Sequence, residues 1–333
     1  LTPQGMQTTV LTNSIQSVFL EQIRQSLPRN LSFADELAEV LNVSRDSVYR
    51  RIRGETVLSL EEVQKLCNQY KVSLDSLLSP SSEIISFNKR SIDPVSFTLE
   101  HWLMSILNNL EMIDSFPDKE VIYSAKDIPI SYYFKFPGLA LFKMFFWMKS
   151  YQRHPKYEKL PYEPELVSRQ LLAVGKKLWD KYAEIPCSEI WSDETFNVTI
   201  RQVEFYFENG FITLKQARAL LEEYIVMIND IRNSAAEGIK KEGSGTFLLY
   251  KNDFVISDTT FLFKMGDKRM AFITYNTMNI LATAQESFCR ETEDYLTNII
   301  NKSTLISTTG ERERNKFFNQ VEKRIQQTTE LLR

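Results

Sequence analysis

The chain has 333 residues, of which 43% are hydrophobic and 12% aromatic, so it exceeds an average single domain and can build a sizeable core. Its 40 basic and 43 acidic residues give a net charge of −3, which excludes a polyelectrolyte surface spread over the whole chain. A surface that binds nucleic acid must therefore be local.

Residues that carry chemistry are scarce. Cys67, Cys187 and Cys289 lie too far apart in sequence for a disulfide framework or a CxxC metal site, which predicts a reduced, cytoplasmic setting. Two histidines, His101 and His154, supply little material for a metal site or a catalytic triad. Neither GxGxxG nor GxxxxGK[ST] occurs. We therefore expect no enzyme activity and no cofactor or metal.

Residues 1–16 are predicted to be a tail, and the five residues before Met6 are predicted to be a cloning remnant rather than part of a signal peptide. The most apolar stretch, 128–148, is interrupted by prolines and lysines, whereas a membrane-spanning helix needs about 20 mostly apolar residues. We expect this stretch to be core, not membrane.

Residues 17–79 are predicted to form a domain of short helices, each with its own start signal. Ser32, Ser44 and Ser59 are N-cap residues, and Glu62 completes a capping box with Ser59. Gly54 stands where a helix end requires a left-handed residue. The five predicted helices are 18–26, 33–41, 45–53, 60–70 and 74–78.

The second and third of these helices have the pattern of a helix-turn-helix. Leu37 and Leu41 line the inner face of the first helix of the pair, and Val43 and Val48 supply the core residues of the second. Asn42 occupies the tight turn, where asparagine tolerates a left-handed backbone.

In a major groove, the helix 45–53 would present its N-terminal residues to base edges. Its four arginines and one aspartate give a local charge of +3, which is the local basic patch that the balanced composition demands. Arg51 and Arg53 suit phosphate contacts, which position a protein without reading sequence. The predicted DNA-binding residues are Ser44, Arg45, Asp46, Ser47, Tyr49, Arg50, Arg51 and Arg53.

Residues 17–79, about a fifth of the chain, resemble the Cro/lambda-repressor (XRE) family of five-helix DNA-binding domains. The runs VSRDSVYRRIRG at 43–54 and LSLEEVQKLCNQYKVSLDSLL at 58–78 match that family in order and spacing. The family usually has an apolar residue where Arg51 stands and a polar one where Ile52 stands, which leaves open which of the two faces the core. The resemblance implies transcriptional regulation, with base contacts at Arg45, Asp46, Ser47, Tyr49 and Arg50.

A linker is predicted at 80–93, followed by an effector or dimerisation region at 94–333. This region is predicted to be helical over 94–242, to contain a small antiparallel β-meander over 243–276, and to end in helices over 277–333. The expected fold class is therefore mainly α, a five-helix domain followed by a larger helical domain with a meander (α+β). The predicted helices are 93–114, 136–151, 165–182, 195–208, 214–240, 277–301 and 311–332, with a short strand at 121–124.

Local signals support parts of this assignment. Asp93 and Pro94 form an N-cap and N1 pair, and Thr213 with Gln216 forms a capping box. The runs FLLY, FVIS, TFLFK and MAFITY between 247 and 275 are rich in β-forming residues and are separated by turn signals. Their apolar residues fall on both faces, so helices should cover the sheet.

Two apolar seams could make a dimer or pack within their own domain. One runs along 214–235, with Leu214, Ala217, Leu221, Tyr224, Ile228, Ile231 and Ala235, and the other lies in the last helix, with Phe318, Val321, Ile325 and Leu332. The aromatic run at 131–148 is expected to be core rather than a ligand pocket.

These observations predict a sequence-specific, DNA-binding transcriptional regulator that forms a homodimer on double-stranded DNA and can respond to an unknown effector. The alternatives are a protein-interaction scaffold built on a helix-turn-helix fold, and an enzyme that carries this domain as an appendage.

Overall fold

The computed structural model describes residues 14–27, 31–70, 72, 74, 85–89, 97–254, 256, 258–275 and 277–332. The chain folds as two units, Leu1–Ser86 and Phe87–Arg333. Several predictions concern other residues: residues 1–13 of the tail, most of the helix 74–78, most of the linker 80–93, and the helix start at Asp93 and Pro94 lie outside the described residues.

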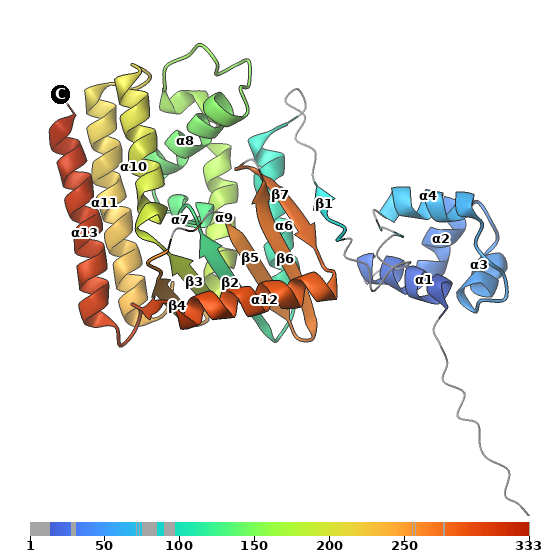
Figure 1. The fold of residues 1–333 in the computed structure, drawn as a ribbon. Coiled ribbons are helices and arrows are strands. Elements are labelled where there is room, and N and C mark those ends of the chain that lie inside the picture. Colours follow the sequence, from blue (N-terminus) through green and yellow to red (C-terminus); the bar gives the residue numbers. More distant parts are fainter. Residues whose placement is uncertain are drawn as a thin grey trace, which may run out of the picture. The chain divides into compact units, whose positions relative to one another are not determined.

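The described part of the smaller unit is helical (Figure 1). Phe19, Ile23, Leu37, Val48 and Leu66 are almost fully buried in its core, so each helix contributes to one apolar centre. The helices are α1 (Ile15–Ser26), α2 (Phe33–Leu41), α3 (Arg45–Ile52) and α4 (Leu60–Tyr70), which confirms the four predicted helices that fall on described residues.

The two predicted left-handed positions are confirmed. Asn42, between α2 and α3, has φ 54° and ψ 50°. Gly54, after α3, has φ 77°, a conformation that residues with a Cβ atom rarely adopt. These two residues set the turns on either side of α3.

Two of the three predicted serine caps form. Ser44 Oγ accepts a hydrogen bond from the backbone N–H of Ser47 at 3.3 Å. Ser59 and Glu62 form a reciprocal capping box, in which each side chain accepts from the backbone N–H of the other residue. Ser32 precedes α2, but its side chain makes no cap hydrogen bond.

The larger unit is built on a mixed sheet of eight strands in the order β1-β7-β6-β5-β2-β3-β4-β8. The central pairs β2–β3 and β3–β4 are parallel, whereas the other pairs are antiparallel. The strands are β1 (Asn88–Lys89), β2 (Lys119–Ala125), β3 (Cys187–Trp191), β4 (Phe247–Lys251), β5 (Thr260–Met265), β6 (Lys268–Tyr275), β7 (Asn279–Thr283) and β8 (Thr304–Leu305).

The predicted fold class needs correction, because this sheet is neither small nor a simple meander. β5, β6 and β7 are antiparallel neighbours, but β4 pairs in parallel with β3, and β7 occupies residues that were expected to be helical. β3 was not predicted, because its five residues are all buried and include a glutamate, so they show no alternating pattern. A mainly α description is not confirmed: the sheet forms the centre of the unit.

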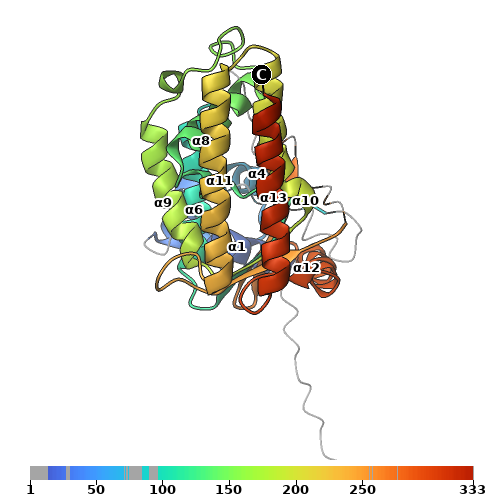
Figure 2. The ribbon, with the colours of Figure 1, turned by 90° about the vertical axis from the view of Figure 1, so that its left-hand side faces the viewer.

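Helices cover both faces of the sheet (Figures 1 and 2). Neighbouring residues of β2 show why: Val121 packs into the larger core on one face, and Ile122 packs with Cys289 and Leu296 under α12 on the other. The helices are α6 (Leu99–Asp114), α7 (Ile130–Tyr133), α8 (Pro137–Phe146), α9 (Gln170–Glu184), α10 (Asp193–Glu208), α11 (Leu214–Glu237), α12 (Glu286–Asn301) and α13 (Glu311–Leu331), with a π-helical turn at Trp147–Tyr151 and a 3₁₀ turn at Pro164–Leu166.

The apolar seams of α11 and α13 are used inside the unit. The two helices lie side by side (Figure 2), and the seam residues from Ala217 to Ala235 and from Phe318 to Leu332 are buried. The aromatic run is also core, as predicted, since Leu139, Phe142 and Phe146 are buried. In the described part of the chain, no helix is long and apolar enough to cross a membrane.

An ion pair lies at the centre of the larger unit. Glu189 of β3 and Lys240 are both almost fully buried, with 2.9 Å between the lysine Nζ and the glutamate Oε1. Tyr132 and Tyr182 donate to Oε1 at 2.9 and 2.7 Å, and the indole N–H of Trp191 donates to Oε2 at 2.9 Å. Both carboxylate oxygens are therefore hydrogen-bonded without water.

Burial alone would lower the pKa of Lys240, but the neighbouring Cys187 and Glu189 raise the pKa above its usual value. The lysine therefore keeps its proton next to the glutamate carboxylate.

The Lys240→Met variant should lose about 3–5 kcal/mol of unfolding free energy, because the Glu189 carboxylate stays buried without its cation. Adding Glu189→Gln should restore much of this loss. Lys241→Met, at a partly exposed lysine that pairs with Glu184, is the matched control and should cost less than about 1 kcal/mol. Urea unfolding followed by tryptophan fluorescence measures all three variants; equal losses for Lys240→Met and Lys241→Met would contradict this account.

Candidate nucleic-acid interface

α3 has one buried and one exposed face. Val48 is fully buried, and Ile52 packs against the same core, so these two residues fix the inner side of the helix. Ser47 is half-buried, and its backbone N–H donates to the side chain of the N-cap residue Ser44. The exposed residues among the predicted DNA-binding set are Ser44, Arg45, Asp46, Tyr49, Arg50 and Arg53.

Arg51 is placed differently from the other arginines. Its guanidinium donates to both carboxylate oxygens of Glu62 in α4, at 3.2 and 2.7 Å, and to the backbone carbonyl of Ser47 at 3.1 Å. The side chains of Arg51 and Glu62 are only 14% and 17% exposed. The departure from the family pattern at 51 and 52 is thereby resolved: Ile52 faces the core, and Arg51 joins α3 to α4 rather than pointing toward a phosphate.

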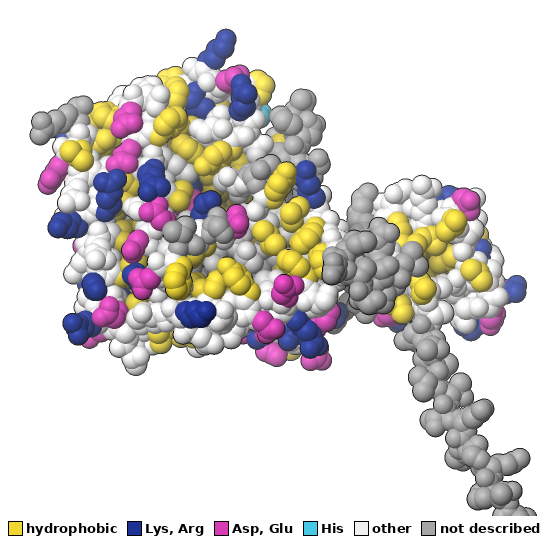
Figure 3. Space-filling model, viewed as in Figure 1, with side chains coloured by type: hydrophobic (Ala, Val, Ile, Leu, Met, Phe, Trp, Pro, Cys, Tyr) yellow, Lys and Arg dark blue, Asp and Glu magenta, His cyan; other side chains and the backbone are white. Residues whose placement is uncertain are grey.

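Acidic residues neutralise part of the charge on α3. Arg45 pairs with Asp35 of α2, and both Arg50 and Arg53 lie against Glu55, at 3.7 and 2.6 Å. Figure 3 shows acidic side chains among the basic ones at the α3 side of the unit. Water and salt screen exposed pairs of this kind, so each contributes little to stability, and a phosphate or a base can replace the carboxylate.

Gln16 is a positioning residue that the sequence reasoning missed. Its Nε2 donates to the backbone carbonyls of Arg51 and Thr56, at 2.8 and 2.9 Å, and its Oε1 accepts from the backbone N–H of Leu58 at 2.9 Å. It thus ties the end of α3 and the following turn to α1. Gln16 lies in the predicted tail, and a single glutamine gives no signal of such a role.

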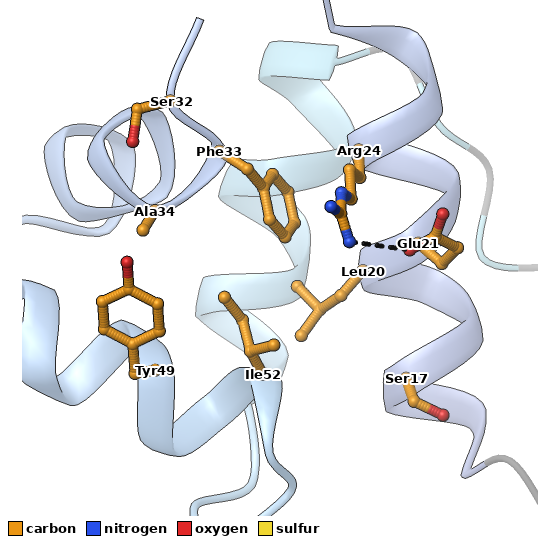
Figure 4. A pocket seen from close by; sticks show the side chains of 9 residues that line it. All are labelled: Ser17, Leu20, Glu21, Arg24, Ser32, Phe33, Ala34, Tyr49 and Ile52. Carbon is orange, nitrogen blue, oxygen red and sulfur yellow. Dashed lines mark ion pairs between the residues drawn. The ribbon is translucent and has the colours of Figure 1, made fainter.

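A hollow of about 400 Å³ lies beside α3, between α1 and the start of α2 (Figure 4). Tyr49 and Ile52 of α3, Phe33 of α2, and Leu20 and Arg24 of α1 are among the residues that line it. Tyr49 is 48% exposed. The hollow therefore leaves part of this side chain open to contact from another surface.

Comparison with known proteins agrees with this geometry. Residues 20–77 match the model of a protein family described as helix-turn-helix. No curated protein and no solved structure matches the chain. The smaller unit is therefore a helix-turn-helix domain of the Cro/lambda-repressor-like (XRE) family. The match ends at residue 77 and does not extend to the larger unit. Among the described residues, no group of histidine, cysteine and acidic side chains could hold a metal ion.

The Arg51→Gln variant should lose about 1–3 kcal/mol of unfolding free energy in the smaller unit at neutral pH, since Glu62 would keep its partial burial without its cation. Arg53→Gln, which breaks only an exposed pair, is the control and should leave the transition unchanged. Scanning calorimetry of the full chain measures both variants. Equal behaviour of the two would contradict the assigned role of Arg51.

The difference between wild type and Arg51→Gln should depend on pH. Partial burial raises the pKa of Glu62, but the Arg51 guanidinium and the Ser59 N–H outweigh it, and the pKa is lowered from 4.5. The stabilisation is then complete above pH 4.5 and is lost as the pH falls through the lower pKa of the folded state. The two proteins should converge in stability at acidic pH.

Proposed function

We propose that the chain is a sequence-specific, DNA-binding transcriptional regulator that inserts α3 into the major groove. The observation that carries the proposal is the exposed polar face of α3, opposite Val48, in a unit that matches the helix-turn-helix family. The base-contacting residues of the proposal are Arg45, Asp46, Ser47, Tyr49 and Arg50, with Arg53 and Ser44 toward the phosphates.

The free energies favour such a contact. A good bidentate pair between an arginine and guanine is worth about 1–3 kcal/mol of discrimination. The exposed pairs that Arg45 and Arg50 make with Asp35 and Glu55 cost less than this to open. Arg51 stays in place and keeps α3 fixed against α4. The helix therefore reads bases from a rigid support.

The protein is further proposed to act as a homodimer, because a small module contacts few bases and paired half-sites lie about 34–36 Å apart. The buried seams of α11 and α13 leave other surfaces to make the dimer contact. In this proposal the larger unit responds to an effector and changes the spacing of the two domains.

Selection of bound genomic fragments should yield a palindromic motif with wild-type protein. Arg45→Ala and Arg50→Ala should each weaken binding by roughly ten-fold or more and relax the preference at one base pair, because each removes one base contact. Lys65→Ala, at an exposed lysine of α4, is the matched control and should bind like wild type. Unchanged motifs and affinities in the two arginine variants would contradict the assignment.

The alternative is a protein-interaction module, which the acidic partners of Arg45, Arg50 and Arg53 favour. Salt separates the two functions, because phosphate contacts release counterions and protein contacts need not.

With the two Arg53 side chains of a dimer on phosphates, DNA affinity should fall roughly ten-fold between 50 and 200 mM salt. Arg53→Gln should make the dependence of log affinity on log salt shallower by about 1 for each phosphate that the arginine neutralises in wild type. Fluorescence anisotropy with a labelled fragment measures both slopes. Affinity that does not change with salt would favour the interaction module, whereas a slope that Arg53→Gln leaves unchanged would contradict the phosphate contact of Arg53.

A further inference from the structure

A polar pocket opens in the larger unit where the parallel and antiparallel halves of the sheet meet. Its volume is about 330 Å³, within the range of small-molecule sites. Ser124, near the end of β2, and Thr260, at the start of β5, are register partners at its base. In sheets with parallel strands, ligands bind beyond the carboxyl ends of the strands. Ser124 lies near the carboxyl end of β2, which pairs in parallel with β3 and antiparallel with β5.

One wall of the pocket is firmly anchored by Asn252, which directly follows β4 and is 2% exposed. Its backbone N–H donates to the carbonyl of Trp191 at the end of β3, at 2.7 Å. Its side-chain amide donates to Ser303 Oγ at 2.8 Å and accepts from the N–H of Phe254 at 2.7 Å. Asn252 therefore links this wall to the end of β3 and to the segment after α12.

The other wall is the last part of α12, which supplies Tyr295 and Asn298, together with Lys302 directly after the helix. Phe254 and Tyr295 come from different walls, and both are large apolar residues with most of their surface exposed, at 64% and 57%. A ligand between them would bury part of both rings, which is the apolar contribution expected of a binding pocket.

The pocket carries one charge of each sign. Asp258 belongs to the segment between β4 and β5, and Lys302 follows α12. Both are exposed, and neither forms an ion pair with another described residue. Several other charged residues between 251 and 293 do form such pairs. Charges of opposite sign on different walls fit a ligand that carries both charges itself.

We propose that this pocket binds a small zwitterion of the amino-acid class, with its ammonium group at Asp258, its carboxylate at Lys302 and its side chain against Phe254 and Tyr295. A free amino acid and a dipeptide share this chemistry. The site would be the effector site of the regulator; that regulatory role rests on the proposed function, whereas the binding itself does not.

The test is calorimetric titration of the full-length protein with each of the 20 free L-amino acids and with dialanine, at millimolar concentration. At least one of these compounds should bind. Asp258→Asn and Lys302→Gln should each weaken that binding roughly ten-fold or more, because each removes a charge-assisted hydrogen bond. The matched controls are Asp267→Asn and Lys215→Gln, at exposed charged residues outside the pocket lining, and both should bind like wild type.

N-acetylation of the best ligand, or amidation of its carboxylate, should abolish binding to wild type, since each removes one of the two charges. No binding of any of these compounds, or equal binding by the pocket variants and the controls, would overturn the proposal. Operator affinity is measured separately with and without the ligand. Ligand binding without DNA binding would contradict the proposed function and leave the pocket standing, whereas DNA binding without ligand binding would do the reverse.

Discussion

The larger unit depends on one buried interaction, the ion pair between Glu189 and Lys240. A charged pair taken out of water costs several kcal/mol per ion, and only close geometry with further hydrogen bonds repays this cost. Tyr132, Tyr182 and Trp191 supply those hydrogen bonds from α7, α9 and the end of β3. The pair therefore constrains which helices can lie over the parallel strands, because any other arrangement would leave a buried charge unpaired.

The smaller unit has a weaker counterpart in the pair between Arg51 and Glu62. This pair and the hydrogen bonds of Gln16 fix both sides of α3, one to α4 and the other to α1. The exposed arginines of α3 do not hold the helices together, since their ion pairs with Asp35 and Glu55 lie at the surface. Because α3 is held in place and its surface ion pairs are weak, its exposed arginines can leave these carboxylates and bind the anionic groups of another molecule.

The two units differ in how their contacts are distributed along the chain. In the smaller unit, successive helices pack on one another, and their caps are made by residues three positions apart. In the larger unit, β3 lies between β2 and β4, from which it is separated by long helical segments. The proposed effector pocket belongs to this second kind of structure, because Ser124, Asn252 and Lys302 meet only once the sheet is complete.

The sequence by itself determined the features whose physical cause is local. Helix periodicity, the caps at Ser44, Ser59 and Thr213 and the left-handed turns at Asn42 and Gly54 depend on a few neighbouring residues, and the structure contains all of them. The helix-turn-helix and the exposed face of α3 follow from such signals.

Tertiary structure decided the rest. β3 shows no alternation because both of its faces are buried, and β4 pairs with it in parallel rather than within a meander. Arg50 and Arg51 are neighbours with the same side chain. Arg51 has a structural role because Glu62 lies beside it, whereas Arg50 stays exposed. The seam of α11 would look the same in a dimer or in a core, and the packing of α13 against it shows that it is core. These features depend on residues distant in sequence, and a local pattern carries no information about them.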